Sequence, residues 1–123
     1  MKAYTDLDQL KKLAEILPIE SADMHYATWT ILDGEFIVST NQGSTIEDLQ
    51  EDYGNQINPC WSLTALLDVL LYPQLSKDKL GSGKEGWMVS AYPDNCRYDS
   101  CWHDNPVDAC VEMILKLHEL NLL

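Results

Sequence analysis

Basic residues are scarce in this chain of 123 residues. Eight Lys and Arg stand against 20 Asp and Glu, so the formal net charge is −12 at pH 7. A charge of this sign and size repels the phosphate backbone of nucleic acids and the surface of anionic membranes. We therefore expect neither direct nucleic-acid binding nor membrane binding, and we expect a protein partner to offer a basic surface.

Long apolar runs are also missing. The longest apolar stretches, residues 65–67 and 69–72, are separated by Asp68 and closed by Pro73, well short of the ~20 residues that a transmembrane helix needs. Residues 1–6 contain no apolar run that could form the core of a signal peptide. We therefore expect a cytoplasmic protein whose four cysteines are reduced thiols.

A phosphate-binding loop is not present either. The segment Gly81-Ser82-Gly83-Lys84 lacks the preceding buried strand and the full spacing of that motif. Residues 77–86, rich in glycine and charge, predict a solvated loop instead. We expect no cofactor.

The chain does have enough apolar material for one core. Hydrophobic residues make up 46% of the sequence, and a chain of this length buries about two-thirds of its unfolded surface without disulfides. We therefore expect a single domain spanning residues 1–123.

Two elements are predicted in the first third of the chain. Leucines at helical spacing predict a helix over residues 6–17, with Thr5 and Asp8 as its capping pattern. Residues 26–40 then alternate with period two around Asp33-Gly34, which predicts a hairpin with a two-residue turn. This turn places Trp29 opposite Val38.

The middle of the chain predicts two helices. A capping box opens a short acidic helix over residues 44–53. Asn58-Pro59 has the pattern of an N-cap followed by a first-turn proline, which predicts a helix over residues 60–72. This second helix is apolar nearly all round, so we expect it at the centre of the core or in a homodimer interface.

The last third predicts a second hairpin and a final helix. Residues 87–92 and 96–102 form the hairpin, joined through Pro93-Asp94-Asn95. Asn105-Pro106 repeats the N-cap and proline pattern and opens a helix that runs to about residue 120. The predicted fold is therefore α+β, with an antiparallel sheet of hairpins covered by helices in the order α-ββ-α-α-ββ-α.

Three motifs in the second half resemble the small phage and prophage proteins called phage ABA-sandwich domains. They are Pro59-Cys60-Trp61-Ser62-Leu63-Thr64-Ala65-Leu66-Leu67, the strand-opening Gly86-Trp87, and Asn105-Pro106-Val107-Asp108-Ala109-Cys110. The resemblance covers residues 59–121. It implies an origin in a mobile element and a layered fold of helices and sheet, and it implies no activity.

Cys60 is the sharpest candidate for chemistry. In the first turn of a predicted helix, unpaired amides and the helix dipole favour a thiolate. With Gln56 upstream as an oxyanion donor and His103 as a base, Cys60-Trp61 is similar to the papain-like cysteine hydrolases. The alternative, which we favour, is a small buried thiol.

A metal site is not expected, although four soft ligands lie close together in the sequence. Cys101 and His103 are separated by one residue only, and Cys110 belongs to the inward face of the last helix. Structural zinc sites instead use two pairs of ligands separated by a longer loop. Cys96 and Cys101 also point to opposite faces of a regular strand.

The candidate binding face is the acidic helix, whose carboxylates are those of Glu47, Asp48, Glu51 and Asp52. A row of like charges on a helix is either a solvated face or a recognition surface. From this row and the net charge we predict a small acidic, non-catalytic protein that binds another protein. The two alternatives are a compact cysteine hydrolase, and an inhibitor or immunity-type protein that blocks a nucleic-acid enzyme.

Overall fold

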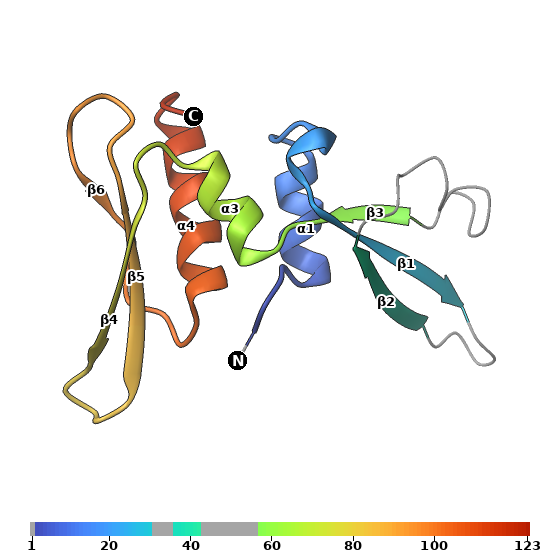
Figure 1. Ribbon diagram of the computed structural model, residues 1–123, viewed down its shortest axis with the longest axis horizontal. Helices are drawn as coiled ribbons and strands as arrows, with labels where there is room; N and C mark the ends of the chain where they lie inside the picture. The colour runs from blue at the N-terminus through green and yellow to red at the C-terminus, as the bar shows by residue number, and fades with distance from the viewer. Residues whose placement is uncertain (1, 31–35, 43–56) are drawn as a thin grey trace.

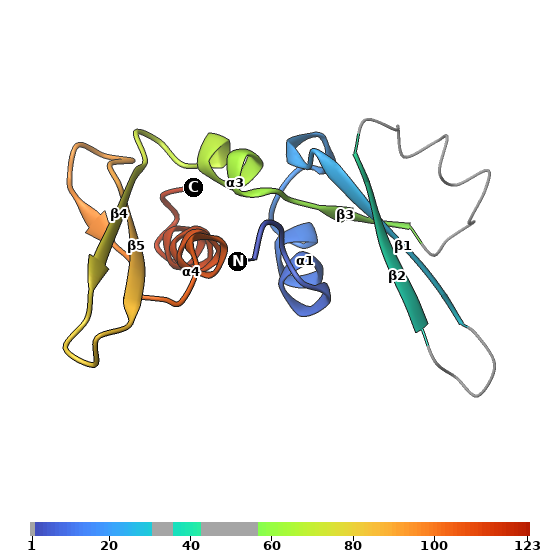
Figure 2. The same cartoon turned by 60° about the horizontal axis from the view of Figure 1, so that its bottom comes forward.

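The computed structural model describes residues 2–30, 36–42 and 57–123. Its helices lie in the middle of the molecule, with a three-stranded antiparallel sheet at each end (Figures 1 and 2). The strand order is β2-β1-β3 in one sheet and β4-β5-β6 in the other. The predicted α+β class, with antiparallel hairpins against helices, is confirmed.

The elements in chain order are α1 Leu7–Ala14, the 3-10 helix η1 Ile19–Ser21, β1 Met24–Thr30, β2 Phe36–Gln42, β3 Ile57–Cys60, α3 Leu63–Val69, β4 Gln74–Lys79, β5 Glu85–Ala91, β6 Tyr98–Asp99 and α4 Pro106–Glu119. The helix predicted over residues 44–53 lies outside the described residues.

Helix α1 forms where its leucine spacing predicts it, but its cap is Asp6. The Asp6 carboxylate accepts the Gln9 N–H at 2.8 Å, and the Gln9 side chain accepts the Asp6 N–H at 3.1 Å. These reciprocal bonds are a capping box. The predicted pattern of Thr5 and Asp8 is wrong by one residue, because Thr5 is fully buried and its N–H donates to the carbonyl of Trp61 at 3.0 Å.

The first hairpin is present, but its predicted register is wrong. Trp29 pairs with Ile37 rather than with Val38. An odd number of residues separates these partners, whereas a two-residue turn leaves an even number between every pair. The one-residue difference exchanges the faces of one strand relative to the other. The predicted turn, Asp33-Gly34, lies outside the described residues.

The predicted helix over residues 60–72 is wrong at both ends. Asn58-Pro59 belongs to β3, which pairs with β1 and forms an edge of its sheet. Proline is tolerated on an edge strand because its missing N–H removes no bond that the sheet needs. The same dipeptide suits a helix start, so pairing with β1 decides between the two.

Two residues separate the end of β3 from the start of helix α3, which has a cap built by Ser62 and Asp23. The Ser62 hydroxyl accepts the Ala65 N–H at 3.3 Å. The Asp23 carboxylate accepts both the N–H of Ser62, at 2.9 Å, and its hydroxyl. At the other end, the helix stops at Val69 because its C-cap, Leu70, is extended with a ψ of 143°. Tyr72, with a φ of 50°, and Pro73 follow and keep the chain from continuing as a helix.

Residues 77–86, predicted as a loop, lie mostly in the β4–β5 hairpin. Its turn is closed by the N–H of Leu80, which donates to the carbonyl of Lys84 at 2.8 Å, and Gly83 adopts a φ of 83° there. β4 is an edge strand with mostly exposed polar side chains. It therefore has no alternation of apolar and polar residues from which a strand could be predicted.

The second predicted hairpin and the final helix are confirmed. β5 and β6 pair antiparallel, with Ala91 opposite Tyr98, and Asn95 takes a φ of 68° in the turn between them. The Asn105 side chain accepts the N–H of Asp108 at 2.9 Å, and Pro106 occupies the first turn of α4. This cap is the one that the sequence predicts.

The core lies between α1, α3, α4 and the inner face of β5. Its fully buried side chains include Leu10, Trp61, Leu66, Val89 and Ile114. α4 covers one face of the β4-β5-β6 sheet, and the other sheet joins the helices through β3, next to α1 (Figure 1). One continuous core therefore spans the helices and reaches both sheets.

Replacing Leu66 with alanine should lower the free energy of unfolding by roughly 2–5 kcal/mol, because Leu66 has no exposed area. The matched control is Leu71→Ala, which removes the same atoms from a side chain that is 50% exposed and should cost under about 1 kcal/mol. Urea unfolding measures both values. Equal losses for the two variants would contradict the placement of α3 in the core.

A polar cluster around Asp108 ties the N-terminal segment to α1 and α4. Its carboxylate accepts hydrogen bonds from Lys2 at 2.9 Å, from Gln9 at 2.7 Å and from Asn105 at 2.8 Å. Partial burial opposes ionisation of Asp108, but these bonds outweigh it and hold its pKa below the usual value. The ionised carboxylate therefore stabilises the folded protein.

Asp108→Asn should lower stability at pH 6 by roughly 1–3 kcal/mol, because donors in the cluster lose a charged acceptor. A lowered folded pKa stabilises above the unfolded value of 3.8, and this contribution disappears as the pH falls through the folded pKa. The gap between wild type and variant should therefore close as the pH falls below about 4. Urea unfolding at pH 6 and pH 3 tests this, with the exposed Asp104→Asn as the control.

Candidate functional site

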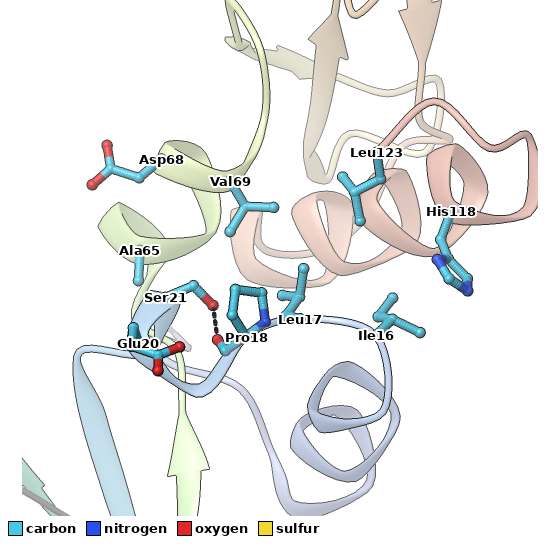
Figure 3. Close-up of a pocket in the computed structure, with 10 residues that line it drawn as sticks. All are labelled: Ile16, Leu17, Pro18, Glu20, Ser21, Ala65, Asp68, Val69, His118 and Leu123. Atoms are coloured by element: carbon cyan, nitrogen blue, oxygen red, sulfur yellow. Dashed lines mark hydrogen bonds between the residues drawn. The ribbon is translucent and has the colours of Figure 1, made fainter.

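A groove lies at the C-terminal ends of α1, α3 and α4 in the described structure. It has a volume of about 710 Å³. We call it the helix-end groove. Its walls come from the residues that follow α1, from η1, from the last turn of α3 and from the end of α4 (Figure 3). Segments far apart in the sequence thus meet at one surface.

The floor and the sides of the groove are apolar. The contributing residues are Ile16, Leu17, Pro18, Ala65, Val69 and Leu123. Apolar lining with a few polar groups at defined positions is typical of binding sites in proteins. The lining alone therefore marks the groove as the strongest candidate for a site among the described residues.

The polar lining residues lie at the two ends of the groove. Glu20, Ser21 and Asp68 lie at one end, and His118 lies at the other, with the apolar side chains between them (Figure 3). Glu20 is exposed and so is Asp68. The groove is therefore acidic at one end.

One wall is fixed by hydrogen bonds that begin at a buried tryptophan. The indole N–H of Trp61 donates to the Ser21 hydroxyl at 2.9 Å, and this hydroxyl donates to the carbonyl of Pro18 at 2.6 Å. Trp61 has no exposed area. Ser21 is therefore part of the wall's support, and η1 is held in place against the core.

The opposite wall depends on a turn after α4. Asn121 takes a φ of 57°, and the N–H of Leu122 donates to the carbonyl of Leu117 at 2.8 Å. A left-handed residue followed by a bond back to the last turn of a helix is the Schellman arrangement. This turn brings Leu123 over the groove.

A second, smaller hollow of about 240 Å³ adjoins the groove. It shares Val69 and Leu123 with the groove and is also lined by Leu71, Pro93 and Leu122. The two hollows together form one apolar surface that runs from η1 to the β5–β6 turn.

Exposed large apolar side chains gather around this surface. Seven such side chains are found among the described residues. Two of them, Leu71 and Leu123, line the hollows, and three more, Ile19, Tyr72 and Leu120, lie within two residues of lining residues in the chain. Exposed apolar residues scattered singly need no explanation, whereas a cluster around a hollow marks an interaction site.

Cys60 does not have the surroundings that its predicted reactivity needs. It is the last residue of β3 and not part of a helix, so the predicted helix dipole does not act on it. The thiol has no exposed area and lies 3.5 Å from the Thr5 hydroxyl. The structure therefore matches the alternative interpretation, a small buried thiol.

His103, the predicted base, lies in a different environment. Its backbone bonds to Trp87 in both directions, and its Nε2 lies 3.3 Å from the carboxylate of Glu112. Glu112 also accepts the N–H of Cys101 at 2.7 Å. The third predicted participant, Gln56, lies outside the described residues.

The four residues considered for zinc are dispersed in the structure. Cys96 is exposed in the β5–β6 turn, whereas Cys110 is buried in α4. Cys101 and His103 both contact Glu112, but no group of three or more ligand residues within residues 2–30, 36–42 and 57–123 has the geometry to hold a metal ion.

Glu47, Asp48, Glu51 and Asp52, the predicted binding face, lie outside the described residues. The sequence interpretation did not include the helix-end groove. The signal for it was the apolar residues placed just beyond helix-ending residues. Ile19 follows Pro18, and Leu122 and Leu123 follow Asn121. Apolar residues in such positions cannot be buried by the helix that has just ended.

Comparison with known proteins gives no matching family model, no matching curated protein and no matching solved structure. None of the helices in the described part of the chain is both long and apolar enough to cross a bilayer.

Thiol titration with a chromogenic disulfide should separate the four cysteines into two pairs. Cys96 and Cys101 are exposed and should react in the native protein, whereas Cys60 and Cys110 are buried and should react only after unfolding. Burial also raises the pKa of Cys110 to about 12. Fast reaction of Cys60, with loss of function in Cys60→Ser, would instead support the hydrolase.

Cys101 should react more slowly than Cys96, because its hydrogen bond to the Glu112 carboxylate and the charge of that group raise the pKa of its thiol. Glu112→Gln should remove this difference. The single-cysteine variants give the individual rates at pH 8.

Proposed function

We propose that this protein is a small, non-catalytic binding domain that acts in the cytoplasm by capturing a protein with a basic surface. The observation that carries the proposal is the helix-end groove, an open apolar hollow with the exposed Leu123 in its lining and Glu20 and Asp68 at one end. An apolar centre with a charged rim is the usual anatomy of a protein–protein interface.

The net charge of −12 supports the same proposal. Opposite charge on a partner speeds the encounter of two proteins before any close contact forms. The row of carboxylates at Glu47, Asp48, Glu51 and Asp52 is part of our proposal as a second acidic contact, which acts mainly through this long-range attraction.

The resemblance of residues 59–121 to phage ABA-sandwich domains supports a proposed origin in a phage or prophage. Within this origin, an inhibitor or immunity-type protein is the more specific form of the proposal. Its target would be the basic substrate site of a nucleic-acid enzyme, to which a strongly acidic surface is complementary.

The apolar helix α3 supports a homodimer less well. Ala65, Leu66 and Leu70 are buried within the chain, and Leu63 and Leu67 pack against the same core. These contacts use the side chains that a dimer interface would need. Two copies would also repel each other through their equal net charges.

Association with the partner should slow as salt rises. The Debye length falls from about 30 Å at 0.01 M salt to about 10 Å at 0.1 M, so the long-range attraction is screened. Glu47→Lys combined with Glu51→Lys should lower the association rate more than it raises the dissociation rate, as expected for rim charges. The partner is identified by pull-down from the host, and stopped-flow kinetics of the purified pair across salt concentrations gives both rates.

The outcome of the pull-down distinguishes the forms of this proposal. A nuclease or other nucleic-acid enzyme whose activity falls on binding supports the immunity type. Recovery of free DNA, or of a partner whose association rate is unchanged by salt and by the double reversal, contradicts the electrostatic binder. Size measurement by light scattering gives the oligomeric state in the same buffers.

A further inference from the structure

Building on the proposed function, we infer that the helix-end groove takes one amphipathic helix of the partner, with leucine-like side chains on the apolar floor and Lys or Arg against Glu20 and Asp68.

Three helices end at the groove, and each end favours positive charge. α1 ends just before the lining residues Ile16 and Leu17, α3 ends with the lining residues Asp68 and Val69, and α4 contributes His118 from its last turn. The aligned peptide dipoles of a helix place about half a negative charge at its C-terminus. The side chains of Glu20 and Asp68 add two full negative charges.

The walls of the groove decide which element fits. A strand binds by pairing with the free edge of a sheet, and the groove is lined by helix ends and η1 and not by any of the described strands. A helix binds through side chains spaced at three and four residues, and it needs an apolar channel for them. The groove and the smaller hollow beside it, joined at Val69 and Leu123, supply such a channel.

The polarity of the groove orients the bound helix. Its carboxylates lie at the end formed by η1 and α3, and His118 lies at the other end (Figure 3). The basic residues of the bound helix therefore lie toward η1, and its apolar residues continue over Val69 and Leu123 toward Leu71.

The direct test uses a fluorescent 14-residue peptide of leucine and lysine, with leucines at helical positions i, i+3, i+4 and i+7. Two control peptides accompany it. One has the same composition with the leucines distributed around the helix, and the other has glutamate in place of lysine. Fluorescence anisotropy gives the dissociation constant of each peptide for the full chain and its variants.

Two pairs of matched variants locate the binding. Glu20→Lys with Asp68→Lys should weaken binding of the amphipathic peptide about tenfold. Asp78→Lys with Glu85→Lys changes the net charge by the same amount at the distant end of the β4–β5 hairpin. This pair should change the dissociation constant of the peptide less than about threefold. Leu123→Ser should weaken binding, whereas Trp102→Ser, at another exposed apolar side chain, should not.

Every other result overturns the inference. It fails if the amphipathic peptide does not bind, if the peptide with distributed leucines binds equally well, or if the two double variants lose the same affinity. It also fails if the purified partner binds the Glu20 and Asp68 double variant as tightly as wild type. In that last case the proposed function survives with a different surface, because the partner still binds. Circular dichroism confirms the fold of each variant.

Discussion

The position of Trp61 is the constraint on which the other features of the structure depend. Its side chain is fully buried at the point where β3 ends and α3 is about to begin. Its carbonyl accepts the N–H of Thr5, and its backbone N–H donates to the Thr5 hydroxyl. Its indole N–H donates to the Ser21 hydroxyl. One residue therefore joins the first sheet, the N-terminal segment, η1 and α3, and it fixes the wall against which the groove is formed.

The groove follows from the way in which the helices stop. α1 ends at Ala14, four residues before Pro18, α3 ends at Val69, before the positive φ of Tyr72, and α4 ends at Glu119, two residues before the left-handed Asn121. Each stop leaves apolar residues that continue past the helix, and the packing around Trp61 brings the three stops to one side of the molecule (Figure 1). These residues make the surface apolar. It is also electronegative, because the dipoles of the three helices place negative partial charge at their C-termini, beside the carboxylates of Glu20 and Asp68.

Local patterns in the sequence predicted those elements whose caps act locally. Asn105-Pro106 opens α4 as expected, since its hydrogen bond lies within one turn. Asn58-Pro59 has the same pattern but belongs to β3, because pairing with β1 is a contact between distant segments that no local pattern contains. β4 was missed for a similar reason, since an exposed edge strand needs no apolar alternation. The apolar residues beyond the helix ends can be seen in the sequence, but their assembly into a groove cannot, because the groove exists only where three helix ends meet.

The electrostatics of the protein act over two different ranges, and a partner would meet them in sequence. The net charge of −12 attracts a basic surface over the Debye length, about 10 Å at 0.1 M salt. The partial charges of the helix ends act only within about one turn, and they face a partly desolvated apolar floor in which salt screens little. The first interaction is indifferent to the shape of the partner, whereas the second requires a cation placed beside an apolar side chain. In the function we propose, net charge therefore governs how often partners meet, and the groove governs which of them stay bound.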